Sequence, residues 1–395
     1  MKLCFTRISI KTYFFYDISI NNENILLFLP SLLILTTSIL RSHKSMNNRL
    51  LPLLLILFII SLSNASVAKA IIGEKLTWQH NQLPIQTELR GSAVTVKHLW
   101  VVGNKNTVFI SKNKGTTWQD VSPKNNTITA YNFRDIEVLN DSTAIIMSVG
   151  SGEESTLQIT KNQGASWEIL RINKEPEGFY DSIAFWDEQN GVLIGDPIDG
   201  HFVIEITRDQ GHSWQRISIN KLPIITVKEA AFAASGNTLV VGEIGEIWFT
   251  TGGLSASVYH STDFGETWKK SPIALENTTE TSGGYALGLN TNKQIFVLGG
   301  NYLKRDGHYN NMATLKNNQW HVVDNGGHGL RTAMSCVKNI CISTGKLSSD
   351  ISTDNGKSWR PFYAPGFYTL SSHNNTILAA GSDGKVAVLM IGDNG

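Results

Sequence analysis

Cysteine is scarce in this chain, with three residues among 395. Cys4 lies in an N-terminal region that we expect to be absent from the folded protein, which leaves Cys336 and Cys341. The sequence has no C-x-x-C-H haem-attachment motif, no cysteine cluster for an iron–sulfur centre, and no histidine or further cysteine at metal-ligand spacing. It therefore predicts neither a metal site nor a cofactor.

The chain also lacks an excess of charge of either sign. Its 34 lysines and arginines nearly balance 33 acidic residues, giving a formal net charge of +1, and no basic run is present. Because phosphate binding needs clustered lysine and arginine, this balance argues against a nucleic-acid partner. No long helix-period stretch follows residue 70, and there is no G-x-G-x-x-G fingerprint of a dinucleotide site.

The first 70 residues differ in composition from the rest. A short polar, basic lead at residues 46–49 precedes an apolar run at 50–62, and small residues follow up to an A-x-A pattern at 68–70. We predict a signal peptide over residues 46–70 and a secreted or periplasmic protein. An uncleaved membrane anchor is the alternative, although the run is short for a spanning helix. We interpret residues 1–45 as an upstream mis-start, or else as an extra apolar membrane segment.

One short pattern, Ser/Thr-x-Asp/Asn-x-Gly-x-x-Trp, occurs five times in the remainder of the chain. Its first residues are typical of a tight turn, in which the Asx side chain caps backbone N–H groups and the glycine adopts a positive φ. We predict that each copy is a β-hairpin turn whose tryptophan lies on the returning strand and packs between repeats. The Asx and Trp positions are Asn113 and Trp118, Asn162 and Trp167, Asp209 and Trp214, Asp263 and Trp268, and Asp354 and Trp359.

This pattern resembles the Asp-box, or BNR repeat, of β-propellers, a group that includes sialidases, sortilin-type receptors and the photosystem II stability/assembly factors. In those folds the motif lies between the third and fourth strands of a blade, on the face away from the usual ligand site. The resemblance implies a β-propeller in which these residues have a structural role and carry no chemistry.

The spacing of the tryptophans gives the number of blades. A degenerate copy without the glycine ends at Trp320, and an incomplete unit follows Trp359. The segment Leu76-Thr-Trp78 supplies the strand that this last unit lacks, which closes the ring without free sheet edges. We predict an all-β, seven-bladed β-propeller of four-stranded blades, as a single domain over residues 71–395, in which the N-terminal strand joins the C-terminal blade. Six or eight blades are the alternatives.

Within each unit, an apolar second strand ends in glycine, and we place residues 239–242 in such a strand. The connections between second and third strands then open opposite the repeated turns, beside the central channel. Convergent arginine, aspartate and tyrosine side chains at a channel mouth are typical of a polar ligand site, whereas the alternative is turn chemistry and structural ion pairs. The candidate binding residues are Arg134, Asp135, Asp181, Asp196, Tyr302 and Arg331.

Cys336 and Cys341 flank a segment that is typical of a tight turn between two strands. In an oxidising compartment two cysteines on facing strands of one hairpin can form a disulfide. Two buried free thiols are the alternative.

Several segments, among them Phe133-Arg-Asp-Ile136 and Gly195-Asp-Pro197, resemble the photosystem II assembly factor-like group of exported bacterial propellers. The resemblance extends over essentially all of residues 71–395. Members of that group are often labelled oxidoreductases or BNR-repeat hydrolases, whereas the assembly factors themselves bind a partner protein on a basic patch. This chain has no such run of arginines. We predict a monomeric, exported scaffold that binds an exported or membrane protein or peptide, with a glycan as the alternative ligand.

The alternative function is a sialidase-like or other glycoside hydrolase. The Arg-Ile-Pro segment that opens sialidases is absent, because Leu89-Arg90-Gly-Ser92 stands in its place, and this puts the hydrolase in doubt. Its residues would be Arg90, Arg134 and Arg331 as a carboxylate clamp, Tyr285 with Glu229 as the nucleophile, and Asp181 as the acid.

Overall fold

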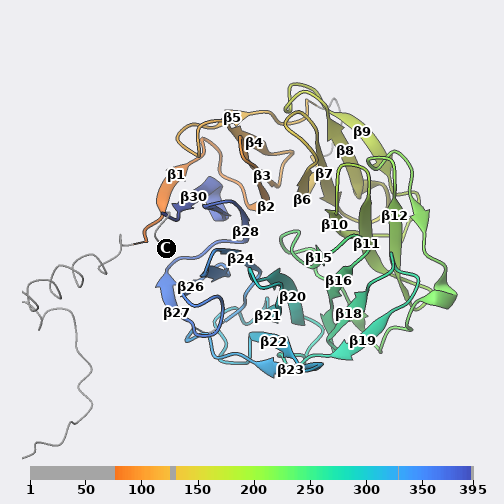
Figure 1. Ribbon diagram of the computed structural model, residues 1–395. Coiled ribbons are helices and arrows are strands. Elements are labelled where there is room, and N and C mark those ends of the chain that lie inside the picture. Colours follow the sequence, from red (N-terminus) through yellow and green to blue (C-terminus); the bar gives the residue numbers. More distant parts are fainter. Residues whose placement is uncertain (1–75, 125–129, 328, 393–395) are drawn as a thin grey trace, which may run out of the picture. The chain divides into compact units, whose positions relative to one another are not determined.

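The computed structural model describes residues 76–392 except 125–129 and 328. In this part of the chain, β-strands form seven antiparallel sheets arranged as blades around a ring (Figure 1). The predicted all-β, seven-bladed propeller is therefore confirmed. Residues 1–45 and the predicted signal peptide at 46–70 lie outside the described residues. No helix among the described residues has the length and apolar character needed to cross a bilayer.

The first four blades follow one another along the chain. Blade 1 consists of β2 (Leu89–Val94), β3 (Leu99–Gly103), β4 (Val108–Ser111) and β5 (Gln119–Asp120). Blade 2 consists of β6 (Asn132–Val138), β7 (Ala144–Val149), β8 (Thr156–Thr160) and β9 (Glu168–Ile172). Blade 3 consists of β10 (Tyr180–Phe185), β11 (Gly191–Ile198), β12 (His201–Thr207) and β13 (Gln215–Arg216). Blade 4 consists of β15 (Leu239–Val241), β16 (Ile247–Thr250), β18 (Ser257–Ser261) and β19 (Lys269–Pro272).

The remaining blades complete the ring. Blade 5 consists of β20 (Ser282–Leu289), β21 (Ile295–Asn301), β22 (Met312–Lys316) and β23 (Gln319–Val322). Blade 6 consists of β24 (Ala333–Val337), β25 (Ile340–Thr344), β26 (Ser349–Ser352) and β27 (Arg360–Tyr363). Blade 7 consists of β28 (Thr369–His373), β29 (Thr376–Ala380), β30 (Lys385–Met390) and β1 (Gln79–Gln82). Two short strands, β14 (Glu229–Ala230) and β17 (Gly252–Gly253), pair beside β20, and single 3-10 turns lie at Gly152–Glu154, Ile219–Lys221 and Ser382–Gly384.

An N-terminal strand closes the ring, as predicted, but the strand is β1 (Gln79–Gln82) and not the preceding segment Leu76–Trp78 that was expected to form it. β1 pairs antiparallel with β30 from Gln79↔Val388 to Gln82↔Lys385. Trp78, which precedes β1, is buried, and its ring centroid lies 5.4 Å from that of Phe367 in the core of blades 6 and 7. The first described strand thus covers an edge that would otherwise be open.

All five predicted turns have the same hydrogen bonds, and each lies between the third and fourth strands of its blade. In every copy the Asx Oδ1 accepts the backbone N–H of the residue four positions later at 2.8–2.9 Å. The first Ser or Thr hydroxyl accepts the glycine N–H at 2.8–2.9 Å, and the glycine φ lies between 82° and 86° across the five copies. Their tryptophans pack against five different buried clusters of the ring. Each tryptophan lies one residue before the fourth strand of its blade, and not on that strand as predicted. The five copies therefore share one hydrogen-bonded turn whose tryptophan packs into the core of the ring.

Substitution within one turn has a predictable cost. Asp354→Ala removes the acceptor for two backbone N–H groups, those of Lys357 and Ser358. We expect it to lower the free energy of unfolding by about 1–2 kcal/mol, as for the loss of a capping side chain. Asp354→Asn is the matched control, since Asn113 and Asn162 already fill this position in two other blades. We expect little change for Asn in urea denaturation, and an equal loss for both variants would contradict this role.

The fifth blade uses a different turn at the position of the degenerate copy. β22 and β23 are joined by Asn317 and Asn318, whose φ values are 50° and 61°. Asparagine tolerates this left-handed conformation, which suits a two-residue hairpin. Trp320 lies on the fourth strand itself, packs against the core between blades 4 and 5, and donates from its Nε1 to Ser271 Oγ at 3.1 Å.

Blade 4 departs from the predicted strand order. Residues 239–242 were expected to form a second strand, but Leu239–Val241 is β15, the innermost strand. The preceding residues 231–238, which we call the crossing segment, leave the blade and reach into the centre of the ring (Figure 1). The apolar pattern of a buried strand is the same for the first and the second strand of a blade, so this pattern could not distinguish the two positions.

The crossing segment is held by blades on several sides of the channel. Ser182 Oγ of β10 donates to the Gly236 carbonyl at 2.9 Å, and Ser235 Oγ donates to the Thr332 carbonyl, before β24, at 2.6 Å. Gly236 has a φ of 71°, and an added Cβ would lie 2.4 Å from Asp135 Oδ1. Only glycine fits this close approach without displacing a neighbour.

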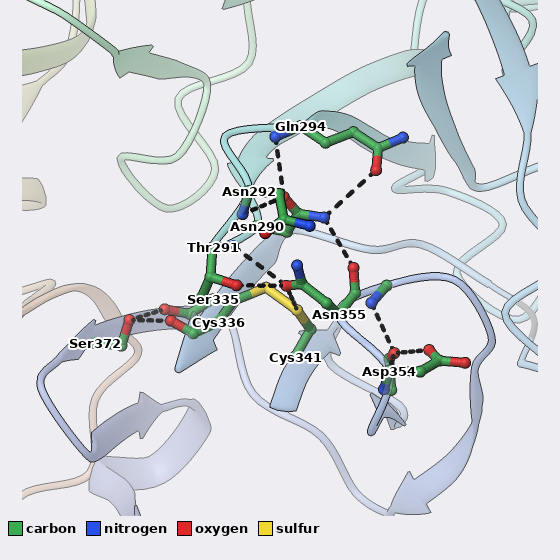
Figure 2. Close-up of a disulfide and its surroundings, with 12 residues drawn as sticks. Asn290, Thr291, Asn292, Gln294, Ser335, Cys336, Cys341, Asp354, Asn355 and Ser372 are labelled. Atoms are coloured by element: carbon green, nitrogen blue, oxygen red, sulfur yellow. Dashed lines mark hydrogen bonds between the residues drawn. A yellow bond between two sulfur atoms is a disulfide. The ribbon is translucent and has the colours of Figure 1, made fainter. Parts of the chain in front are cut away.

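Cys336 of β24 and Cys341 of β25 are joined by a disulfide (Figure 2). The two residues face each other in the register of this hairpin. Ser372 of β28 donates to the Cys336 carbonyl at 3.1 Å, and Ser335 donates to Ser372 Oγ at 2.7 Å. Of the two sequence alternatives, the structure thus has the disulfide, in a hairpin that is hydrogen-bonded to blade 7.

Candidate functional site

The ring has two distinct faces. The turn face carries the five repeated turns, and the loop face carries the connections between second and third strands, together with those between blades. A pocket of about 350 Å³ lies at the channel mouth on the loop face, with residues 231–234 of the crossing segment in its wall. The crossing segment therefore supplies the inner boundary of this pocket.

Four of the six candidate binding residues meet in this pocket. Arg134 of β6, Asp181 of β10, Asp196 of β11 and Tyr302, in the connection after β21, all line it. They come from blades 2, 3 and 5, so the ring brings together side chains far apart in the sequence. Whether this pocket binds a ligand stays a prediction.

Asp135 lies outside the pocket. A register shift in β6 lies between Phe133 and Asp135, and Arg134 reaches Asn104 of blade 1 whereas Asp135 turns toward β10 of blade 3. Its carboxyl is buried and accepts hydrogen bonds from Ser182 Oγ at 2.7 Å and from the backbone N–H groups of Ile183 and Ile136, both at 2.9 Å. Burial raises the pKa of Asp135 to about 7. Its contacts connect β6 to β10 and to Gly236, and its side chain belongs to the second cavity described below.

Arg331 also lies outside the pocket. Its side chain has no exposed surface, and its Nε donates to Asp350 Oδ2 at 2.8 Å in a fully buried ion pair. Asn325 and Ser343 donate to the same carboxylate oxygen at 3.0 and 3.2 Å. These contacts hold the connection after β23 against blade 6.

The basic side of the pocket begins at blades 1 and 2. The Arg90 guanidinium lies 3.8 Å from the centroid of the Tyr368 ring and pairs with Glu88. Arg134 donates to Asn104 Oδ1 at 2.6 Å, and burial together with the nearby Arg90 lowers its pKa to about 10. With a pKa of about 10, Arg134 remains positively charged at neutral pH.

The acidic side of the pocket belongs to blade 3. The Ala231 N–H donates to Asp196 Oδ1 at 3.2 Å, and burial raises the pKa of Asp196 to about 6. Asp181 is fully buried, and neither of its oxygens has a hydrogen-bond partner among the described residues. Burial and the neighbouring Asp196 raise the pKa of Asp181 well above its ordinary range.

Aromatic and basic residues that the sequence did not single out complete the pocket. Phe232 of the crossing segment stacks on Tyr285 with 4.3 Å between ring centroids. Tyr368, from the connection before β28, and Lys346, from the connection after β25, also line the wall. Phe232 begins one of the segments that resemble the assembly factor-like group, but the sequence assigned it no role in a site, and only the path of the crossing segment places it here.

Only part of the residue set of the alternative hydrolase lies in this pocket. Arg90, Arg134, Tyr285 and Asp181 line it, but Arg331 is buried with Asp350. Glu229 accepts from Lys270 Nζ at 2.7 Å and from Thr251 Oγ1 at 2.6 Å, and it is not part of the wall. Within the described ranges, no group of three or more His, Cys, Asp or Glu side chains is arranged to hold a metal.

A second cavity, of about 370 Å³, lies on the turn face. Residues 235–237 of the crossing segment line it, together with Asp135, Glu137 and Cys336. The crossing segment therefore contributes to the walls of both cavities at the ring centre.

Comparison with known proteins supports this architecture. Residues 54–322 match the model of the DUF6242 beta propeller domain, whereas no curated protein sequence matches the chain. Among solved structures, YCF48 bound to D1 peptide has 15% identity and a TM-score of 0.59, with 81% of this chain and 98% of that chain covered. YCF48 from Cyanidioschyzon merolae has 15% identity and a TM-score of 0.58, with 79% and 98% covered.

A third similar structure is an enzyme. The GH74 xyloglucanase from Xanthomonas campestris has 12% identity and a TM-score of 0.53, with 79% of this chain and 53% of that chain covered. At such low identities the likeness extends to the fold alone. The predicted resemblance to the group of YCF48, a photosystem II assembly factor, is confirmed at that level.

Proposed function

The chain belongs to the family of DUF6242 β-propeller domains, and from this premise we propose that it is an exported scaffold whose loop face binds a segment of a partner protein. The composition of residues 46–70 supports export, and a disulfide between Cys336 and Cys341 suits an oxidising compartment. The structure of YCF48 with a D1 peptide supports the idea that a propeller of this shape can hold a peptide.

The observation that carries the proposal is the composition of the loop-face pocket. Four basic side chains line it together with several aromatic rings, a combination that suits the carboxylate and apolar groups of a polypeptide segment. The basic residues are Arg90, Arg134, Arg305 and Lys346.

The surroundings of the pocket also suit a protein partner. Large apolar side chains are exposed on the same face, directly beside residues of the pocket wall. Leu303, next to Tyr302, is 72% exposed, and Leu347, next to Lys346, is 43% exposed. Exposed apolar groups around a polar pocket are typical of a protein-binding surface. Because the closed ring holds this surface in place before binding, little conformational entropy is lost when a partner binds.

Affinity capture tests this proposal. The tagged protein is incubated with the envelope and secreted fractions of the cells that make it, beside an Arg134→Gln/Asp196→Asn variant. We expect one enriched partner that the variant fails to retain, while thermal stability changes little because the asparagine side chain still offers an oxygen to the Ala231 N–H. Asp199→Asn, an exposed change in the connection directly after β11, is the matched control and should retain the partner. Equal capture by all three proteins would contradict a role for the pocket.

A further inference from the structure

The pocket is divided by charge. Its two carboxyl groups, Asp181 and Asp196, both belong to blade 3, whereas its basic groups come from blades 1, 2, 5 and 6. No ion pair joins the two sets among the residues that the structure describes. Arg90 pairs with Glu88 instead, and Arg134 donates to Asn104. The acidic side of the pocket is therefore available to a charge from outside the chain.

Asp181 is the residue that points to a ligand. It lies in the pocket wall, it is fully buried, and both of its oxygens are without a hydrogen-bond partner in the described part of the chain. Buried carboxyl groups in folded proteins nearly always have partners, because an unsatisfied one is costly. Asp196 is only half-buried and reaches the pocket space, so a group bound there would lie beside both carboxyls.

The chemistry of such a group follows from its surroundings. A primary ammonium carries one positive charge and three N–H donors, which suits two adjacent carboxyl groups. A divalent metal ion needs more oxygen ligands than these two residues supply. The rings of Phe179 and Phe232 line the same pocket and offer apolar contact to the methylene chain that carries an ammonium group.

We propose that Asp196 and the buried Asp181 form a subsite for a primary ammonium group, so that the segment bound at the channel mouth presents a lysine side chain. This inference rests on the proposed function, because it names the chemistry that the same pocket recognises. Asp196 contacts the ammonium group directly. Asp181 supplies the second carboxyl, which keeps the ammonium on the blade 3 side of the pocket.

Two small probes test the subsite. N-acetyl-lysine methylamide carries the ammonium group, and N-acetyl-norleucine methylamide ends its side chain in a methyl group. Binding of each to the purified full chain is measured by titration with saturation-transfer NMR. We expect the lysine probe to bind at least about tenfold more tightly, the minimum for charge-assisted hydrogen bonds in a desolvated pocket.

Three variants complete the test. Asp196→Asn and Asp181→Asn should each remove the preference for lysine, and Asp199→Asn, an exposed change outside the pocket wall, should leave it intact. Asp196→Asn decides the outcome if the buried Asp181→Asn variant fails to fold. Equal binding of both probes, absence of saturable lysine binding, or a preference that survives Asp196→Asn would each overturn the subsite.

The outcome is separable from that of the capture experiment. Capture that depends on the Arg134→Gln/Asp196→Asn pair, together with probes that bind alike, would leave the scaffold in place and overturn the ammonium subsite. Discrimination between the probes without any captured partner would support the subsite and contradict the protein scaffold.

Discussion

Deletion of residues 76–82 should abolish cooperative folding or lower the melting temperature by more than about 10 °C. The deletion removes β1, exposes the edge of β30 and takes Trp78 out of the core. Truncation of a buried tryptophan alone costs about 3–5 kcal/mol, and the open edge adds a site for aggregation. Circular dichroism melting and size-exclusion chromatography measure both effects.

Addition of the missing strand in trans provides the control. A synthetic peptide of residues 76–82 should restore part of the lost melting temperature, because it supplies the same pairing with β30. A scrambled peptide of the same composition should not. A deleted protein that melts cooperatively near the wild-type temperature would contradict closure of the ring by this strand.

The substitution Arg331→Met should lower the free energy of unfolding by about 3–5 kcal/mol, since it leaves a buried carboxylate without its cation. The side chains of Arg331 and Asp350 are 0% and 1% exposed, so water cannot replace the lost partner. Urea denaturation followed by tryptophan fluorescence measures the change.

The double variant Arg331→Met/Asp350→Asn separates the charge from the packing. Asparagine keeps an oxygen acceptor for Asn325 and Ser343 but carries no charge. We expect the double variant to be more stable than Arg331→Met alone. A loss below about 1 kcal/mol for the single variant, the range of surface ion pairs, or no recovery in the double variant, would contradict a structural role for this buried pair.

Much of the fold could be predicted because its determinants are local. A turn that needs a capping side chain and a positive φ requires the same residue types at the same spacing in every blade that uses it. Asp209 and Asp263, for example, accept the same backbone hydrogen bond in two different blades. The closing strand could be predicted for a similar reason, since an incomplete C-terminal unit requires a complement that the segment before Leu83 supplies. Where Asn317 and Asn318 provide a different turn, the spacing alone still placed the blade.

The rest depended on contacts that no local pattern records. Leu239–Val241 was placed in the wrong strand because residues 231–238 cross the channel, and their hydrogen bonds join blades distant in the sequence. Arg331 was a candidate for the pocket, but it precedes β24 and pairs with Asp350 of β26. Asp135 directly follows Arg134 in the sequence, but β6 has a register shift here and the two side chains bond to different blades.

Site-specific photo-crosslinking tests the location of the binding site most directly. A benzophenone amino acid replaces Leu303 on the loop face or Ile244 on the turn face, two aliphatic residues that are 72% and 66% exposed. We predict that illumination in the native fraction joins one partner protein to position 303 and none to position 244. Equal crosslinking at both positions, or crosslinking at 244 alone, would contradict a binding site at the loop-face channel mouth.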